Sequence, residues 1–415
     1  MVQEIKIEDF SYNLPDEKIP RHPLIQRDQC KLLLRTANGK IYHRRFKELA
    51  DLLPVGTMLV CNDTKVINAR LLFHKPTGAE IEIFILEPIE PSDYALNFQS
   101  TGKCVWKCLV GNLKKWKEGY VTLNVPLSED RIIELKALKL RDLEEGGCEI
   151  EFSWKNSGLT FGTLLEQAGK IPIPPYLNRE SEERDLQDYQ TIYARIKGSV
   201  AAPTAGLHFT PAVFDDLSAH AIPVEKLTLH VGAGTFRPVK SDRIGGHEMH
   251  SEPFTISKDL ISKLIKWKQE RRPVAAVGTT TVRTLESLPY IGLGIIKGKE
   301  NPFHITQWEA YESSSEIDEI EALQSIYNRM VEEKKESITA TTAIMIAPGF
   351  KWHIVDVMVT NFHQPQSTLL LLVSSFLESD SVNGERDNWK EMYEVALKED
   401  YRFLSYGDAC LLIRD

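Results

Sequence analysis

The stretch Val274-Ala-Ala-Val-Gly-Thr-Thr-Thr281 joins a short apolar run to a glycine and three threonines. Two other stretches share this arrangement: Lys226–Val231 leads into Gly232–Thr235, and Ile354–Val359 leads into Thr360–Thr368. Short buried strands followed by polar loops are typical of layered α/β domains, in which ligands bind at the carboxyl ends of the strands. We therefore expect the three loops to converge on one site.

The rest of the α/β pattern surrounds these segments. It begins with the apolar run Thr57–Cys61 and resumes after Gly158. The glycines of Gly292-Leu-Gly-Ile-Ile-Lys-Gly298 superficially suggest a dinucleotide-binding loop, but they follow an expected helix and a proline instead of opening a helix. The pattern predicts an α/β layered domain that is not of the Rossmann type.

Between Arg70 and Trp154 the chain changes to β-rich runs separated by turn residues. Alternation of apolar and polar residues favours antiparallel strands. The expected strands include Ala79–Ile85, Val105–Val110, Tyr120–Val125 and Cys148–Phe152. We predict an inserted all-β barrel domain over residues 69–155, within an α/β domain made of residues 1–68 and 156–415.

Composition excludes several classes of protein. The 415 residues are 42% hydrophobic and 26% charged, which is typical of globular proteins and allows more than one core. We expect a cytoplasmic protein without a membrane anchor, because Met1–Lys6 does not resemble a signal peptide and Leu369–Val373 is too short to span a bilayer. Six cysteines lack the spacing of a metal site or a disulfide scaffold, so we expect free thiols.

A formal net charge of −9 argues against sequence-independent coating of nucleic acid. Two basic stretches still offer local contacts: Lys114-Lys-Trp-Lys117, and Lys266-Trp-Lys268 with Arg271 and Arg272. Each has an ordinary alternative as the solvated edge of a helix or hairpin. Charge alone leaves the partner open.

The segment Ser199–Thr210 is rich in alanine, glycine, threonine and proline and has no amphipathic period, which favours close approach of its backbone to a ligand. Thr210 and Pro211 are typical of a helix start, so His208 lies on the loop before that helix. A histidine there can act as an acid or a base, or be a hydrogen-bonded structural residue.

Two further motifs carry polar side chains. The threonines after Gly278 form a cradle for an anion or hydroxyl, or simply cap a helix, and Arg283 favours a carboxylate or phosphate. His247-Glu-Met-His-Ser-Glu252 lacks the spacing of a zinc site. We interpret it as part of a polar network around a substrate, with His230 and His363 as further members, and we expect no metal.

Together these motifs resemble one family over nearly the whole chain: the S-adenosylmethionine:tRNA ribosyltransferase-isomerases of queuosine biosynthesis. The strings that carry the resemblance include Phe10–Pro15, Asn62–Val66, Ile171–Tyr176, Tyr189–Ala194, Ala201–Thr210, Thr228–Val239, His247–Glu252, Ala276–Ser287, Thr360–His363 and Tyr401–Asp408. The resemblance implies an α/β domain with a β-barrel insert, in agreement with the pattern above.

The resemblance also implies a reaction. The ribosyl group of S-adenosylmethionine is transferred to 7-aminomethyl-7-deazaguanine at the wobble position of tRNA and rearranged, which gives epoxyqueuosine and releases adenine and methionine. S-adenosylmethionine is consumed as a co-substrate, so no cofactor is expected. We expect tRNA as the partner and a monomeric enzyme.

Such chemistry needs one base and one acid, and the sequence leaves their assignment open among five candidate catalytic histidines: His208, His230, His247, His250 and His363. Candidate substrate-binding residues are Asp63, Thr204, Gly206, Gly232, Gly234, Thr235, Thr279, Thr280, Thr281, Arg283, Asn361, Arg402, Tyr406 and Asp408. Asp63 or Asp408 would pair with the guanine-like edge of the base. Tyr176, Tyr401 and Tyr406 either stack on the base or belong to the core.

Three departures from the family are visible, one of them Gln29-Cys-Lys31, where the family usually has Ala-Ser-Arg. Residues 288–340 hold an extra block, in which Ser313 and Glu316 predict a capped surface helix running to Glu333. Gln366 stands where the family usually has lysine. Two rival functions stay open: an RNA-binding module without catalysis, which would not release adenine, and a metal-dependent hydrolase, which would contain stoichiometric metal.

Overall fold

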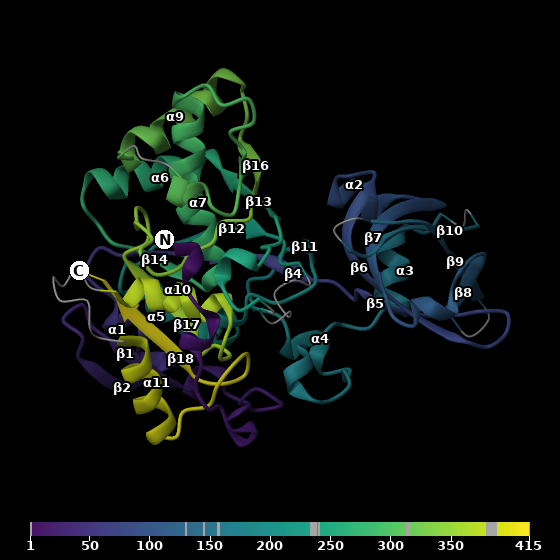
Figure 1. The fold of residues 1–415 in the computed structure, drawn as a ribbon, viewed down its shortest axis with the longest axis horizontal. Coiled ribbons are helices and arrows are strands. Elements are labelled where there is room, and N and C mark those ends of the chain that lie inside the picture. The colour runs from purple at the N-terminus through teal and green to yellow at the C-terminus, as the bar shows by residue number, and fades with distance from the viewer. Residues whose placement is uncertain are drawn as a thin grey trace.

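The computed structural model describes residues 2–128, 131–143, 146–155, 158–232, 239, 241–312, 316–378 and 388–414. The chain forms a body, in which helices cover a large mixed sheet, and a closed β-barrel that stands beside it (Figure 1). The predicted fold class, a layered α/β domain with an inserted barrel, is confirmed. The residue boundaries of the two domains stay predictions.

The body is built on one ten-stranded sheet with the order β15-β16-β13-β12-β3-β14-β17-β18-β1-β2. Strands β12, β3, β14 and β17 at its centre are parallel, and β17 pairs antiparallel with β18. The bounds are β1 Lys31–Arg35, β2 Ile41–Arg45, β3 Met58–Asn62, β12 Val224–Leu229, β13 Glu252–Ser257, β14 Val274–Val277, β15 His304–Ile305, β16 Ser337–Thr342, β17 Val357–Asn361 and β18 Ala409–Ile413. A two-stranded sheet joins β4 Thr64–Val66 to β11 Ile196–Ser199.

Both faces of the central sheet are buried, which explains why its strands are apolar throughout. Val274 and Ala276 of β14 pack into one hydrophobic cluster, and Ala275 and Val277 pack into another. A strand points successive side chains to opposite faces, so a continuous apolar run suits a strand covered on both sides. The run Val274–Val277 is such a strand.

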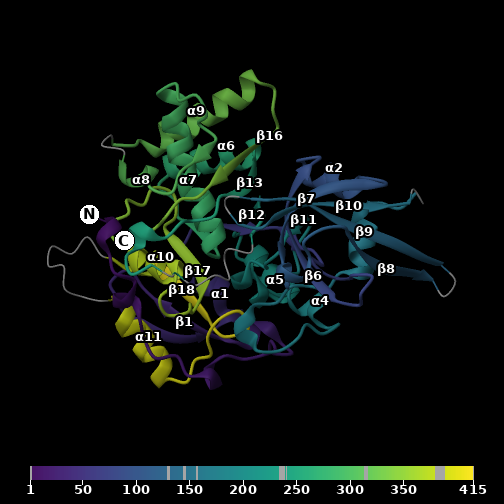
Figure 2. The ribbon, with the colours of Figure 1, turned by 45° about the vertical axis from the view of Figure 1, so that its right-hand side comes forward.

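Helices α6, α7, α9, α10 and α11 cover one face of the sheet, and α1 and α5 cover the other (Figures 1 and 2). Thr210 caps α5 and Pro211 occupies its first turn, as predicted. The bounds are α1 Leu49–Leu52, α4 Asp185–Asp188, α5 Pro211–Ala219, α6 Lys258–Gln269, α7 Thr279–Ile296, α8 Glu309–Glu312, α9 Glu319–Glu332, α10 Thr368–Leu377 and α11 Asn388–Lys398.

Six antiparallel strands close the barrel in the order β10-β7-β6-β5-β8-β9. Ile81, Ile83 and Ile85 alternate along β6 and are fully buried inside it. Helix α3 packs into the same core. The bounds are β5 Arg70–His74, β6 Glu80–Glu90, α2 Tyr94–Gln99, β7 Lys103–Val110, β8 Tyr120–Ser128, β9 Arg131–Asp142, β10 Cys148–Trp154 and α3 Phe161–Ala168.

Two local expectations were wrong. Gly292 does not follow a helix but lies inside α7, where a Cβ would come within 2.3 Å of Ala322 O, so the glycine lets α9 pack closely on α7. The helix expected from Ser313 begins at Glu319, because Asp318 accepts hydrogen bonds from the amides of Ile320 and Glu321. Ser313 itself lies outside the described residues.

Candidate active site

Two of the three loops expected to converge, those after β14 and β17, line one pocket in the body, and Val231 after β12 lines it too. Of the third loop, Gly232–Thr235, the structure describes only Gly232, which is not among the lining residues. Val231 follows β12, Gly278 follows β14, and Asn361 ends β17. The pocket therefore lies at the carboxyl ends of parallel strands, where layered α/β domains bind ligands. Its other lining residues are Tyr176, Tyr189, Ala201–Ala205, His247, Met249, His250, Glu252, Thr279, Thr280, Arg283, Ile344–Ile346, Thr360, Phe362–Leu369, Leu372, Leu404 and Ser405.

The first turn of α7 forms one wall of the pocket. Gly278 precedes it with a φ of 85°, a left-handed conformation that favours glycine, and no side chain caps the turn. Thr279 and Thr280 line the pocket, and Thr280 Oγ1 is buried without a hydrogen-bond partner among the described residues. Thr281 is fully buried and its Oγ1 donates to Val277 O at 2.7 Å. Uncapped amides beside two hydroxyls suit an anionic or hydroxyl group.

A chain of hydrogen bonds leads from Cys30 to the pocket wall. Cys30 Sγ lies 3.3 Å from His208 Nδ1, and His208 Nε2 lies 2.8 Å from Asn361 Oδ1. Asn361 Nδ2 donates to Thr204 Oγ1 at 3.2 Å. An amide oxygen only accepts, so His208 carries its proton on Nε2 and its Nδ1 accepts from the thiol. Thr204 and Asn361 line the pocket, and His208 orients Asn361 from behind.

Two buried histidines are held in the neutral form. Burial lowers the pKa of His208 to about 4 and the pKa of His363 to about 3. His363 lines the pocket, its Nε2 lies 3.0 Å from Thr360 Oγ1, and its amide donates to Tyr393 Oη at 2.9 Å. Neither imidazole is poised to hold a proton near neutral pH.

Arg283 and Glu252 form a buried ion pair in the pocket wall. Arg283 Nε also donates to Ile344 O at 3.3 Å, and Glu252 Oε1 accepts from the amide of Gly232 at 3.2 Å. The guanidinium predicted to bind a carboxylate or phosphate is thus already matched by a carboxylate of the chain. This wall carries no net charge.

His247 and His250 belong to the segment between the short 3-10 turn Ile244–Gly246 and β13, and both line the pocket. His247 is half-buried and His250 is exposed. Burial, together with the nearby His250, lowers the pKa of His247. The side chain is neutral at physiological pH, which is the form that accepts a proton.

His230 lies elsewhere, between the barrel insert and the body. Its Nδ1 is 3.0 Å from Thr64 Oγ1, and its ring lies 4.4 Å from the ring of Tyr94 in α2. Burial lowers the pKa of His230 to about 4. The structure places this histidine at the joint between the two parts of the molecule, outside the pocket lining.

Both predicted aspartates lie in structural networks. Asp63 is buried, with Oδ1 accepting from Thr228 Oγ1 at 2.6 Å and Oδ2 3.1 Å from Arg195 Nη2. Asp408 is also buried and accepts from the amides of Lys31 at 2.8 Å and Arg402 at 2.7 Å. Neither lines the pocket, and neither does Arg402, whose Nη2 lies 3.0 Å from Asp408 Oδ1.

The predicted glycines also serve packing. A Cβ on Gly206 would lie 2.1 Å from Tyr193 Oη, so this glycine lets the turn Thr204–His208 pack tightly. Gly232 holds Glu252 through its amide. Gly234 and Thr235 lie outside the described residues.

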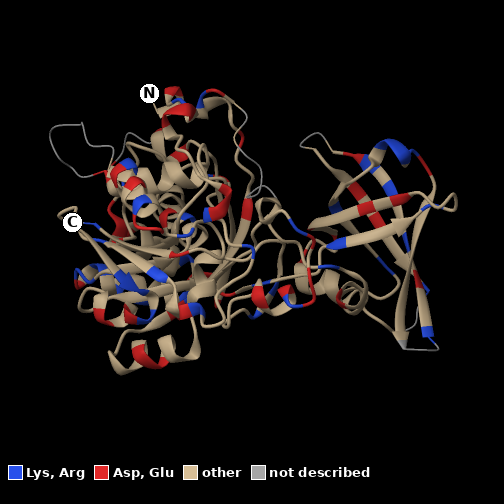
Figure 3. Cartoon of the chain, turned by 90° about the horizontal axis from the view of Figure 1, so that it is seen from below, with Lys and Arg blue, Asp and Glu red and all other residues tan. Residues whose placement is uncertain are grey.

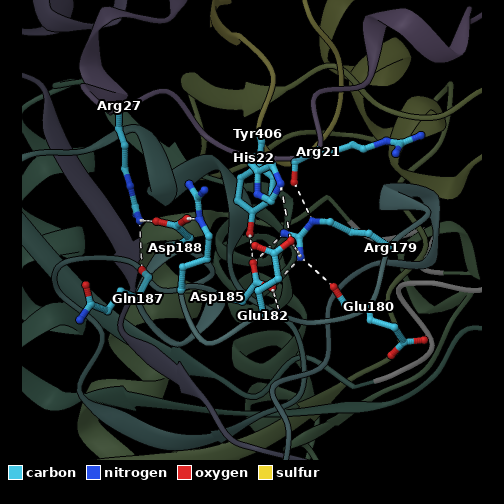
Figure 4. A network of polar contacts seen from close by, with 11 residues as sticks. Arg21, His22, Arg27, Arg179, Glu180, Glu182, Asp185, Gln187, Asp188 and Tyr406 are labelled. Atoms are coloured by element: carbon cyan, nitrogen blue, oxygen red, sulfur yellow. Dashed lines mark hydrogen bonds and ion pairs between the residues drawn. The ribbon is translucent and has the colours of Figure 1, made fainter.

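The segment that carries Tyr176 and Tyr189 is held by a polar network (Figure 4). Arg179 donates from both terminal nitrogens to the buried carboxylate of Asp185, at 2.7 Å each, and Tyr406 Oη donates to Asp185 Oδ1 at 3.5 Å. Tyr406 is thus committed to this network and lies outside the pocket lining.

The same network reaches the N-terminal part of the chain. Arg27 donates to the carbonyl of Gln190 at 3.0 Å. It also donates to the carbonyl of Gln187 at 3.0 Å and lies 3.4 Å from Asp188 (Figure 4). Fixed from two sides, the segment presents Tyr176 and Tyr189 to the pocket.

Of the three tyrosines named from the sequence, Tyr176 alone lines the pocket as the structure describes it. Its Oη lies 2.5 Å from Ser405 Oγ. Tyr401 is buried, with its Oη 2.8 Å from His43 Nδ1.

In the described parts of the chain, no helix is long and apolar enough to cross a membrane. The same residues contain no group of three or more His, Cys, Asp or Glu side chains placed to hold a metal ion. All six cysteines are buried and free.

Known proteins of one kind match nearly the whole chain. The family model described as "Queuosine biosynthesis protein" matches residues 7–412. Curated relatives from Sulfurihydrogenibium sp. (strain YO3AOP1) and Thermotoga petrophila are each 36% identical, over 99% of this chain and 100% of their own length. Both are named S-adenosylmethionine:tRNA ribosyltransferase-isomerase. The chain belongs to this enzyme family.

The family resemblance predicted from the motifs is thereby confirmed. A solved structure also matches: the S-adenosylmethionine tRNA ribosyltransferase of Thermotoga maritima covers 98% of this chain and 100% of its own, at 28% identity with a TM-score of 0.46.

Two of the departures from the family, Gln366 and the block 288–340, lie differently in the fold. Gln366 lines the pocket, has a φ of 55° and donates its amide to Phe10 O at 2.8 Å. The block 288–340 includes α9, which packs on α6 and α7, and most of β16, which leads to Ile344–Ile346 in the pocket wall. This block is therefore part of the body's core.

Several pocket residues were missed from the sequence. Glu252 stood in a quoted motif but was not selected, because nothing in the sequence shows that Arg283 pairs with it. Tyr189, Met249 and Met345 line the pocket as apolar walls. Their spacing cannot be distinguished from that of ordinary core residues.

Proposed function

We propose that the chain transfers the ribosyl group of S-adenosylmethionine to 7-aminomethyl-7-deazaguanine in the wobble position of tRNA and rearranges it to give epoxyqueuosine, releasing adenine and methionine. The names of the curated relatives support this reaction class. The observation that carries the proposal is the composition of one pocket, which is lined by imidazoles, hydroxyls and uncapped backbone amides. The two opposite charges in its wall, Arg283 and Glu252, neutralise each other.

The imidazole of His247 or of His250 is the proposed base. The positive sulfur of the substrate makes the adjacent ribose C–H acidic, and removal of that proton leaves an ylide whose collapse expels adenine. His247 has a depressed pKa and lines the pocket, so it is unprotonated and able to accept. His208 and His363 are more deeply buried and already hydrogen-bonded.

Adenine leaves more easily when a ring nitrogen receives a hydrogen bond. Thr204 is the proposed donor, because Asn361 already donates to its oxygen, which leaves the hydroxyl proton of Thr204 free to point into the pocket. His208 is a positioning residue in this scheme, since it fixes the orientation of the Asn361 amide.

The methionine carboxylate is the proposed ligand of the α7 amides and of the hydroxyls of Thr279 and Thr280. Tyr176 and Tyr189 offer ring faces to the unstacked wobble base. S-adenosylmethionine is consumed, so no resident cofactor enters the scheme, and we propose that a monomer acts on tRNA in the cytoplasm.

The test is to incubate the protein with S-adenosylmethionine and tRNA bearing the deazaguanine precursor, and to measure free adenine together with the mass of the modified nucleoside. We expect one adenine for each epoxyqueuosine. His247→Gln and His250→Gln should slow adenine release, whereas His220→Gln, a control at an exposed histidine of the body, should not.

The two rival functions give different results in this experiment. Intact tRNA binding with no adenine release by the wild type would support an RNA-binding module. Stoichiometric zinc or iron in the purified protein, with hydrolysis lost on chelation, would support a metal-dependent hydrolase.

A further inference from the structure

One loop of the barrel has no part in the proposed chemistry. Residues 111–119, here called the lysine loop, join β7 to β8 and contain the exposed side chains of Lys114, Lys115 and Lys117. Trp116 between them is 1% exposed, and its Nε1 donates to Gly119 O at 2.9 Å. The buried indole anchors the loop, so the three lysines are held at the surface. Figure 3 shows a turn coloured blue, for Lys and Arg, at one end of the barrel.

These lysines differ from several other cations of the barrel. Lys103, Lys136 and Lys139 each lie near a carboxylate, at 3.7, 3.1 and 3.0 Å from Glu151, Glu134 and Asp142. Among the described residues, no carboxylate lies within ion-pair distance of Lys114, Lys115 or Lys117.

A fourth ammonium group increases the local charge. Lys75 Nζ donates to Lys115 O at 2.9 Å, so its positive charge is held against the same loop. The loop's own carboxylate, Glu118, is exposed and is in no ion pair with the described residues. Crowded like charges repel one another unless an external anion joins them.

The second basic stretch identified in the sequence provides a contrast within the same chain. At the end of α6, Lys268 lies 3.6 Å from Asp356 and Lys266 lies 4.0 Å from Glu270. The guanidinium of Arg272 stacks on Trp267, 3.8 Å from the ring centre. Three of the four cations of that stretch are thus near a carboxylate or stacked on a ring, and Arg271 is the one in no ion pair with the described residues. In the lysine loop, all three lysines are in no such pair.

We propose that the lysine loop binds the phosphate backbone of the tRNA substrate, outside the nucleotide that enters the pocket. The inference rests on the proposed function and names the surface that holds the RNA. With a net charge of −9, the chain attracts a polyanion only where its positive charge is concentrated. Tyr120, which follows the loop and is 49% exposed, adds a ring face on which an unpaired base can stack.

A competing surface exists on the body. Arg44 and Arg45 lie on β2, the edge strand of the large sheet. Their guanidinium groups are engaged by backbone carbonyls, at 3.1 Å from His43 O and 2.9 Å from Gln29 O. Charged side chains also protect an exposed edge strand from pairing with other chains. The side chains of Lys114, Lys115 and Lys117, in contrast, make no hydrogen bond or ion pair with the described residues.

The test compares two triple variants of the full-length protein that remove the same charge. Lys114→Gln/Lys115→Gln/Lys117→Gln removes the unmatched lysines, and Lys103→Gln/Lys136→Gln/Lys139→Gln removes matched lysines of the same barrel. For the loop variant we expect kcat and the KM for S-adenosylmethionine to be unchanged. The slope of log affinity for tRNA against log salt should become shallower by about 2 units, since each phosphate contact contributes about 0.7 to 0.9.

The remaining outcomes decide the proposal. If both triple variants weaken tRNA binding equally, the loop acts only through the net charge of the protein. If only Arg44→Gln/Arg45→Gln weakens tRNA binding, the contact lies on β2. Either result overturns the inference. Binding of tRNA is also measured directly by fluorescence anisotropy. If the wild type binds tRNA without releasing adenine, the proposed function fails, but the loop variants still test the loop proposal through tRNA binding. If the wild type binds no tRNA, the loop proposal fails.

Discussion

The pocket of the body and the lysine loop of the barrel differ in whether their polar side chains have partners within the protein. In the pocket wall, Arg283 is matched by Glu252 and His208 by Asn361, all within a buried setting. On the loop, Lys114, Lys115 and Lys117 are exposed and lack a carboxylate partner among the described residues. Removing one partner of a buried hydrogen bond costs the protein much of its stability, because the other partner stays buried and unsatisfied. An exposed charge contributes little to stability, and its attraction for a ligand falls as salt is added.

Removal of the proposed base should have the largest effect. His247→Gln and His250→Gln should be compared, and the residue that takes the proton should lower kcat for adenine release by about 10²- to 10⁴-fold, the usual contribution of a positioned base. Single-turnover release of adenine measures this step. If both variants keep wild-type rates at saturating substrate, the pocket does not use these imidazoles.

The buried ion pair gives the next largest effect. Arg283→Met leaves the Glu252 carboxylate buried without its partner, which should lower the free energy of unfolding by about 3 kcal/mol or more. The double variant Arg283→Met/Glu252→Gln removes the orphan charge and should recover much of the loss. Thermal unfolding monitored by circular dichroism measures both. Equal destabilisation by the single and double variants would contradict the assignment of this charge pair.

The positioning role of His208 predicts a smaller change with a distinctive signature. His208→Phe leaves Asn361 Oδ1 without its donor, a loss worth about 1 to 3 kcal/mol for a buried acceptor. We expect weaker binding of S-adenosylmethionine with the pH profile of kcat unchanged, because His208 does not titrate near neutral pH. A profile that loses an ionisation in the variant would make His208 the base instead.

Acid should destabilise the pocket through its neutral histidines. The folded pKa of His208 is about 4 and that of His363 about 3, below the unfolded value of 6.5. The unfolded chain therefore binds more protons between these values, and stability falls as the pH falls below 6.5. From about pH 7.5 to pH 5.5, each histidine should contribute about 1.4 kcal/mol to the loss.

Urea unfolding at the two pH values measures this loss. His208→Gln should be less sensitive to pH than the wild type, although it is less stable overall. A variant that keeps the full pH dependence would show that another group is responsible.

Much of the site's location followed from the sequence, and much of its detail did not. Strand-to-loop runs such as Val274–Thr281 predicted which loops meet, because parallel strands end at one edge of a sheet. The same runs do not tell which polar atoms are already hydrogen-bonded within the chain: Asp408 accepts from two backbone amides, Asp63 accepts from Thr228, and Thr281 donates to the last carbonyl of β14. Such pairings join residues far apart in the chain, and no local pattern encodes them.

In the barrel, too, the sequence predicted the strands but not the contacts of the charged side chains. Alternation along Ala79–Ile85 predicted a strand, and the register confirms it. Whether Lys114 or Lys266 lies near a carboxylate depends on residues brought close by folding, so the two basic stretches could not be ranked from the sequence. The structure separates them.

A single lysine of the loop should have the smallest effect, which is what distinguishes this surface from the pocket. Lys115→Gln removes one phosphate contact, so the slope of log affinity against log salt should fall by about 0.7 to 0.9, and the KM for tRNA should rise about threefold at moderate salt. Lys103→Gln, whose lysine lies near Glu151, is the matched control and should change the KM for tRNA less. Because each phosphate contact contributes its own increment to the salt slope, the effects of Lys114→Gln, Lys115→Gln and Lys117→Gln on that slope should add. A single lysine variant that lowered kcat tenfold at saturating tRNA would place the loop within the catalytic machinery, and the contrast between the two regions would no longer hold.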